Sequence, residues 1–168
     1  MTVEFYKYQG TGNDFVIIDN RRYNLSKNDT KTIKLLCDRR FGIGADGLIF
    51  LENSEIEGED FKMVYFNSDG NESTMCGNGG RCLVSFAHYL NIFEKETLFS
   101  AIDGQHEASI SNGVVSLKMQ DVSNIETLEN ALYLNTGSPH YVTLTSDILN
   151  KNIKVDGAAI RYNDRFKK

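Results

Sequence analysis

The sequence has few positive charges and no long apolar run, and each shortage excludes a class of partner. Its 168 residues include 18 Lys and Arg against 23 Asp and Glu, a formal net charge of −5, and no basic run exceeds two residues. A nucleic-acid surface would need clustered basic residues. No apolar run reaches the ~20 residues of a membrane-spanning helix, and the N-terminus lacks the pattern of a secretion signal. We therefore expect a cytoplasmic protein that binds neither nucleic acid nor a membrane.

Cysteine is also scarce, and the spacing of the three present argues against both disulfides and a metal site. An odd number of cysteines without a secretion signal favours free thiols. Cys76 and Cys82 are separated by five residues, and no histidine pair follows them at ligand spacing. Cys37 and Cys82 fall on apolar sides of expected helices, where cysteine acts as a small hydrophobe. Only Cys76 has surroundings suited to reactivity.

Those surroundings are a glycine-rich stretch, CGNGG at residues 76–80, that leads into an apolar helix pattern over residues 82–93. Glycines leave the backbone bare, so amide groups can point outward. The start of a helix has unpaired N–H groups and a partial positive charge, which favour a thiolate or a bound anion. A buried cysteine beside a glycine-rich packing loop is the alternative, and the pattern alone does not decide between them.

The remaining patterns predict an α+β fold, with a mostly antiparallel, curled sheet around the helix that begins near Gly77. A helix starts near residues 26–29, with Gly42 as its stop. The glycines of residues 42–47 match G-x-G-x-x-G, but a helix precedes them and a strand follows, so they predict a turn and not a dinucleotide site. Strands are expected at residues 3–8, 15–19, 48–51, 61–67, 97–102, 105–110 and 114–119.

A second unit begins near Asp121, which divides the chain into residues 1–120 and 121–168. Residues 132–142 have the strand, Thr-Gly, strand layout of residues 6–17, and residues 160–166 are expected to form one more strand or an extended segment. This similarity indicates two pseudo-repeated halves, of which the second is incomplete.

Four motifs carry a resemblance to a known family. They are GTGNDFV at residues 10–16, RFGIGADG at 40–47, FNSDG at 66–70 and MCGNGGR at 75–81. In this order and spacing the sequence resembles the diaminopimelate epimerases. The resemblance covers the whole chain and implies a longer family of two similar halves. It implies that the second catalytic cysteine lies beyond Lys168, so that this chain alone would be inactive.

The resemblance also implies an activity and its residues. The family interconverts LL- and meso-diaminopimelate without a cofactor or metal, on the route to lysine and peptidoglycan precursors, by proton transfer between two cysteines at the α-carbon. It tends to form homodimers. By position, Cys76 and His140 would be catalytic, and the substrate-binding residues would be Asn13, Asn67, Gly77 and Asn78. Gly47 and Ser138 depart from side-chain amides found in some members, so no role is carried over to them.

Two other functions fit part of this pattern. Proline racemases share the fold and the two-cysteine chemistry, but they usually carry a histidine where this chain has Asn78. A non-catalytic ligand-binding or regulatory remnant would keep the anion-binding loop without turnover. Assays with proline and diaminopimelate would separate the two enzymes.

Overall fold

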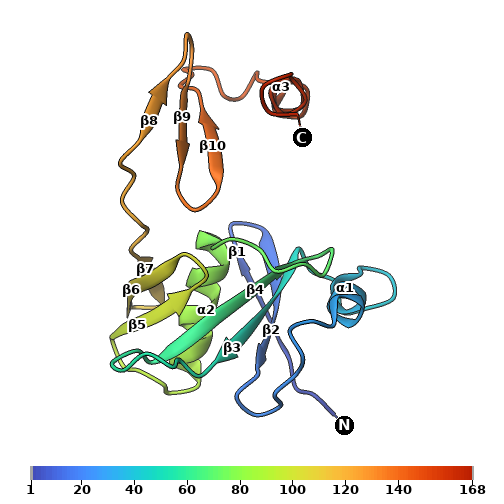
Figure 1. Cartoon of the computed structure of the whole chain (residues 1–168), viewed down its shortest axis with the longest axis vertical. Coiled ribbons are helices and arrows are strands. Elements are labelled where there is room, and N and C mark those ends of the chain that lie inside the picture. The colour runs from blue at the N-terminus through green and yellow to red at the C-terminus, as the bar shows by residue number, and fades with distance from the viewer. Residues whose placement is uncertain (1, 168) are drawn as a thin grey trace.

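The computed structural model describes residues 2–167, which form two sheets and three helices (Figure 1). The elements, in chain order, are β1 (Tyr6–Gly10), β2 (Asn13–Asp19), α1 (Thr30–Cys37), β3 (Gly47–Glu52), β4 (Phe61–Asn67), α2 (Gly77–Tyr89), β5 (Glu96–Ala101), β6 (Gly104–Ser111), β7 (Val114–Leu117), β8 (Ile125–Thr127), β9 (Leu132–Asn135), β10 (Pro139–Val142) and α3 (Ile153–Arg161).

The larger sheet contains β1 to β7 in sequence order, and α2 packs against it. Four neighbouring pairs are antiparallel, whereas β2–β3 and β4–β5 are parallel. Figure 1 shows the sheet curling around α2. The expected α+β fold, a mostly antiparallel curled sheet around a central helix, is therefore confirmed.

Both faces of the central strands are covered, which explains the continuous apolar runs at residues 15–18 of β2 and 48–51 of β3. Successive side chains of a strand point to opposite faces. In β2, Phe15 and Ile17 join the core that contains α2, while Val16 and Ile18 join a second core that contains Ile33 of α1. The sheet thus holds α1 and α2 on opposite sides, and α2 has a fixed position over it.

Helix α2 begins at Gly77, so the glycine run forms its first turn. Cys82, Leu83, Phe86 and Ala87 are buried, as the apolar spacing predicts. A Cβ at Gly80 would lie 2.6 Å from Met75 Cε, and one at Gly79 would lie 3.1 Å from Ile49 Cδ1. These two glycines therefore serve close packing of the helix on the sheet, as the packing-loop alternative requires.

Two boundaries near the N-terminus differ from expectation. Strand β1 begins at Tyr6 and not at residue 3, because its pairing runs from Tyr6 opposite Ile17 to Gly10 opposite Asn13. Helix α1 is capped by Asp29, whose carboxylate accepts from Thr32 N at 3.1 Å, but it ends at Cys37, well before Gly42. Gly42 instead lets the following loop press on the helix end, since a Cβ there would lie 1.8 Å from Leu35 O.

The second sheet has the order β10–β9–β8 and carries α3 beside it. The hairpin over residues 132–142 is as expected, whereas the strand expected at residues 160–166 is wrong. Residues 153–161 form α3, because the Asn152 side chain caps it by accepting from Val155 N at 3.2 Å. After the helix, the Phe166 ring packs against Tyr133 and Tyr141 of the hairpin. Among the described residues, no helix is long and apolar enough to cross a membrane.

Candidate active site

Cys76 occupies the N-cap position of α2, between the loop after β4 and the first helical turn. Its side chain is partly exposed. The first intrahelical hydrogen bond runs from Gly80 N to Cys76 O at 2.8 Å. The amides of Gly77, Asn78 and Gly79 precede that bond and have no partner inside the helix. A thiol thus lies beside unpaired N–H groups at the positive end of a helix dipole.

The cysteine opens onto a cavity of about 480 Å³ between the start of α2, the end of β4 and the β9–β10 turn. In Figure 1 this turn points towards the start of α2, where the loop after β4 enters the helix. The cavity contains four of the residues singled out from sequence besides Cys76. They are Asn67, Gly77, Asn78 and His140.

Asn13, the sixth of these residues, lies beside the thiol at the start of β2. The Cys76 thiol donates to Asn13 Oδ1 at 3.7 Å, and Asn78 Nδ2 donates to the same oxygen at 3.5 Å. Asn13 Nδ2 in turn donates to Asp46 Oδ2 at 2.8 Å. Five of the six sequence-predicted residues therefore line one cavity, and the sixth, Asn13, accepts a hydrogen bond from the Cys76 thiol.

An ion-pair group lies behind Asn13. Arg39 is 2.8 Å from both Asp14 Oδ1 and Asp46 Oδ1, and Lys7 is 2.8 Å from Asp14 Oδ2. The Arg39 guanidinium holds the pKa of Asp14 well below its usual range. The pKa of Asp46 is also lowered, chiefly by the hydrogen bond from Asn13. Both carboxyl groups are consequently ionised at neutral pH.

Tyr65 and Ser73 orient the amide of Asn67, which lines the cavity at the end of β4. Tyr65 Oη donates to Asn67 Oδ1 at 3.0 Å, and Asn67 Nδ2 donates to Ser73 Oγ at 3.0 Å. Burial, with a smaller effect of the nearby Cys76, raises the pKa of Tyr65 to about 12. A Cβ at Gly47 would lie 2.5 Å from Tyr65 Cε2, so the tyrosine ring takes the space that a side chain at position 47 would need.

His140 lies on β10 and remains exposed at the cavity rim. Its Nδ1 is 2.7 Å from Ser138 O and 3.3 Å from Thr136 Oγ1. A carbonyl oxygen can only accept, so Nδ1 carries a hydrogen, and in the neutral ring Nε2 has the lone pair.

The other two cysteines are separate from this site. Cys37 and Cys82 are buried and free of disulfides, and burial raises the pKa of each thiol to about 11. This agrees with their assignment as small hydrophobes. It leaves Cys76 as the accessible thiol among the described residues.

Several cavity residues were not singled out from the sequence. Arg81 and Asn78 are three positions apart on one helix, so helical spacing could have indicated Arg81. Ser138, to which no role was assigned, also lines the cavity, and its Oγ is 2.6 Å from Thr74 Oγ1. Asp46 does not line the cavity but bonds to Asn13, and it had no such signal, because only the parallel pairing of β2 with β3 brings the two together.

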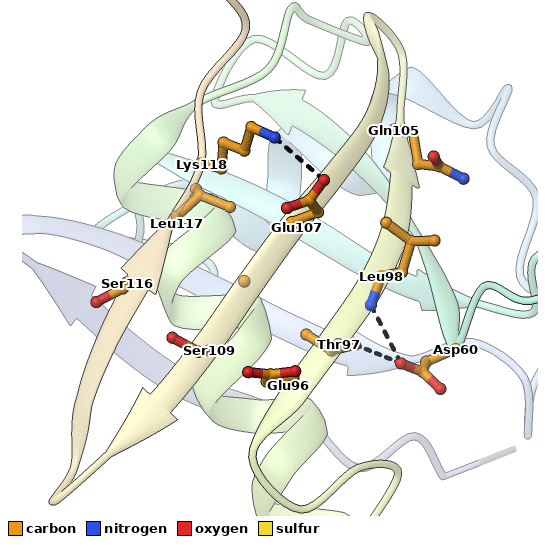
Figure 2. A pocket seen from close by; sticks show the side chains of 11 residues that line it. Asp60, Glu96, Thr97, Leu98, Gln105, Glu107, Ser109, Ser116, Leu117 and Lys118 are labelled. Carbon is orange, nitrogen blue, oxygen red and sulfur yellow. Dashed lines mark hydrogen bonds and ion pairs between the residues drawn. The ribbon is translucent and has the colours of Figure 1, made fainter.

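A larger open hollow of about 870 Å³ lies on β5 to β7, and it is not near the cysteine. Figure 2 shows its side chains in front of these strands, with α2 behind them. Its charged groups pair locally: Lys118 is 3.1 Å from Glu107, and Asp60 accepts from Thr97 Oγ1 at 2.7 Å. With neither a thiol nor an imidazole there, we take the Cys76 cavity as the candidate site. Within residues 2–167 no group of three or more His, Cys, Asp or Glu could hold a metal ion.

Known proteins with similar sequences include diaminopimelate epimerases. A diaminopimelate epimerase from Flavobacterium psychrophilum is 56% identical over 165 residues, covering 98% of this chain and 64% of the relative. A diaminopimelate epimerase from Aquifex aeolicus is 36% identical over 183 residues, covering 98% of this chain and 65% of the relative. The chain thus spans slightly less than two thirds of the length of these relatives.

Solved structures with low sequence identity share the fold. A Bacillus anthracis phenazine biosynthesis protein of the PhzF family matches with a TM-score of 0.65 at 17% identity, over 85% of this chain and 56% of its own. A probable proline racemase from Agrobacterium radiobacter matches with a TM-score of 0.61 at 14% identity, over 93% and 57%. The family model described as diaminopimelate epimerase matches residues 5–124. This chain therefore belongs to the diaminopimelate epimerase family.

Proposed function

We propose that this chain supplies one catalytic half of a cofactor-independent epimerase that interconverts LL- and meso-diaminopimelate, in lysine and peptidoglycan precursor synthesis. The observation that carries the proposal is the position of Cys76, a partly exposed thiol at the start of α2 that faces the 480 Å³ cavity. Family membership supplies the substrate class. The division into residues 1–120 and 121–168, a cytoplasmic location and a homodimer belong to the same proposal.

The chemistry requires strong stabilisation of charge. The α-hydrogen of an amino acid is very weakly acidic, and removing it pushes charge into the α-carboxylate. Unpaired amides at a helix start stabilise that charge as it develops, as an oxyanion hole does. Gly77 and Asn78 line the cavity, and their N–H groups would hold the carboxylate there. Cys76 would then lie beside the α-carbon and transfer the proton.

Other polar groups would bind the rest of the substrate. Asn67 has an amide whose orientation is set by Tyr65 and Ser73, so it presents a fixed donor and acceptor pattern. Asn13 would contact the substrate from the Cys76 side. His140, with Nε2 available at the rim, would exchange a proton with the reacting groups.

Inversion requires an acid and a base on opposite faces of the carbon. Among residues 2–167 the other thiols, Cys37 and Cys82, are buried in the core and cannot reach the cavity. A second thiol for the opposite face would therefore come from outside these residues. We expect no epimerisation by the 168-residue chain alone, and racemisation by it would contradict the two-cysteine mechanism.

Protection of Cys76 from alkylation tests the substrate assignment on this chain. Purified protein is treated with iodoacetamide at neutral pH in the presence of diaminopimelate, proline or no addition, and Cys76 labelling is followed by mass spectrometry. We expect diaminopimelate to slow the labelling and proline to leave it unchanged. Equal protection by proline would favour a proline racemase, and protection by neither would favour a non-catalytic remnant.

A further inference from the structure

A directional chain of hydrogen bonds runs through the two asparagines beside Cys76. Arg81 donates to Asn78 Oδ1, Asn78 Nδ2 donates to Asn13 Oδ1, and Asn13 Nδ2 donates to Asp46 Oδ2. Each end is held by a charged group that can act in one sense only. A guanidinium can only donate, and a carboxylate can only accept.

These ends fix how both amides are oriented. The pKa of Asp46 lies below its ordinary value, so at neutral pH the group has no proton to donate. Asn13 must therefore turn its NH₂ group to Asp46, which leaves its carbonyl oxygen beside the Cys76 sulfur. Asn78 reinforces this orientation, because it presents its own NH₂ group to the same oxygen.

We propose that Asp46 is a positioning residue that acts through Asn13 to hold the Cys76 thiol protonated, ready to donate its hydrogen. An acceptor at 3.7 Å stabilises S–H and gives nothing to a thiolate. This opposes the helix start, which favours the thiolate. Reversing the Asn13 amide would place a donor at the sulfur and favour the thiolate. Calling the thiol a proton donor rests on the proposed function, but the orientation itself does not.

The charged and titratable groups around the sulfur come from several elements. Tyr65 of β4, Arg81 of α2 and His140 of β10 line the cavity, and Asp46 lies behind Asn13. Asp14 lies next to Asn13 in sequence and shares Arg39 with Asp46, but its carboxylate makes no hydrogen bond to the Asn13 side chain. Asp14 is therefore a matched control for the loss of one negative charge.

The experiment compares Asp46→Ala with Asp14→Ala in the full 168-residue chain. Iodoacetamide labelling of Cys76 is measured at pH 7 and at pH 10. The readout is the rate at pH 7 divided by the rate at pH 10. Altered access changes both rates equally, whereas a destabilised S–H raises only the rate at pH 7. We expect the ratio to rise at least about threefold in Asp46→Ala, the effect of one hydrogen bond, and to change less than about half as much in Asp14→Ala.

Two outcomes would overturn the proposal. One is an unchanged ratio in Asp46→Ala. The other is an equal rise in both variants, which would mean that the loss of one negative charge alone explains the change. Because labelling needs no turnover, its result is independent of whether the complete enzyme proves to be an epimerase. If Asp46→Ala does not fold, the infrared S–H band of Cys76 in the wild-type chain tests the proposal instead. This band is identified as the one lost in Cys76→Ala. It should lie below the frequency of a thiol without a hydrogen bond, and a band at that frequency would refute the inference.

Discussion

Thr74 Oγ1 and Ser138 Oγ are 2.6 Å apart, 64 positions from one another in the sequence. Among residues 2–167 this is the one hydrogen bond that joins the segment before α2 to the β9–β10 turn. The turn also approaches the larger sheet at Gly137, where a Cβ would lie 3.4 Å from Asp103 Oδ2. The position of His140 over the cavity therefore depends on few contacts.

Ser138→Ala should loosen the hairpin without unfolding the larger sheet. Loss of one neutral hydrogen bond costs about 0.5–1.5 kcal/mol. Amide hydrogen exchange should become faster in β9 and β10 and stay unchanged in β2 to β4. Thr143→Ala is the control, since this exposed residue lies just after β10. Unchanged exchange in Ser138→Ala would show that the hairpin is held by other contacts.

Thiol labelling should distinguish the three cysteines. Burial raises the pKa of Cys37 and Cys82 to about 11, so both are neutral as well as inaccessible at pH 7.5. We expect iodoacetamide to modify Cys76 at least about tenfold faster than either, because thiolates and not thiols react. Peptide mapping over time measures the three rates. Equal rates would contradict the accessibility of Cys76 relative to the two buried thiols.

Gly80→Ala should destabilise the fold, and Gly77→Ala should not. A Cβ at Gly80 would lie 2.6 Å from Met75 Cε and 2.8 Å from Leu117 Cδ2, so the buried Met75 and the half-buried Leu117 must shift. Overpacking of this kind typically costs about 1–3 kcal/mol. At Gly77 the nearest atom is Met119 Sδ at 3.6 Å, an ordinary contact. Urea unfolding of both variants measures the difference. Equal stabilities would show that the helix tolerates side chains at both positions.

Tyr65→Phe should lose less stability than the wild-type chain as the pH rises from 10 to 12. Burial raises the pKa of folded Tyr65 to about 12, above the ordinary value of 10.0, so its contribution is complete below pH 10 and is lost as pH rises towards 12. The variant lacks the hydrogen bond to Asn67 and should be less stable by about 1 kcal/mol at pH 8. That gap should shrink between pH 10 and 12 in urea unfolding. A constant gap would mean that Tyr65 does not titrate later in the folded state.

Local patterns were sufficient for much of the larger sheet. Strand β4 occupies the expected residues 61–67, and the Asn112-Gly113 turn has φ values of 50° and 76°, as a tight hairpin with this dipeptide requires. The helix start at Gly77 was also readable from sequence. These features depend on residues close together in the chain, so their physical causes are visible in any short window.

Short segments that depend on a single cap or on distant partners are harder to predict from the sequence. Asn152 begins α3 with one side-chain cap, whereas Ile160, Tyr162 and Phe166 are residue types typical of a strand. Likewise, α1 stops at Cys37 because the loop after it folds back on the helix end, a contact that a glycine at position 42 permits but does not reveal.

The sequence by itself determined that one thiol precedes a glycine-rich helix start, and its motifs pointed to the family and to six residues of the site. Only the tertiary structure decided how those residues are oriented. Asp46 reaches Asn13 because β2 and β3 run parallel, and Tyr65 fills the space above Gly47 because β3 and β4 pair at that register. Amide direction is set by contacts between strands that are distant in sequence, and such contacts leave no local pattern.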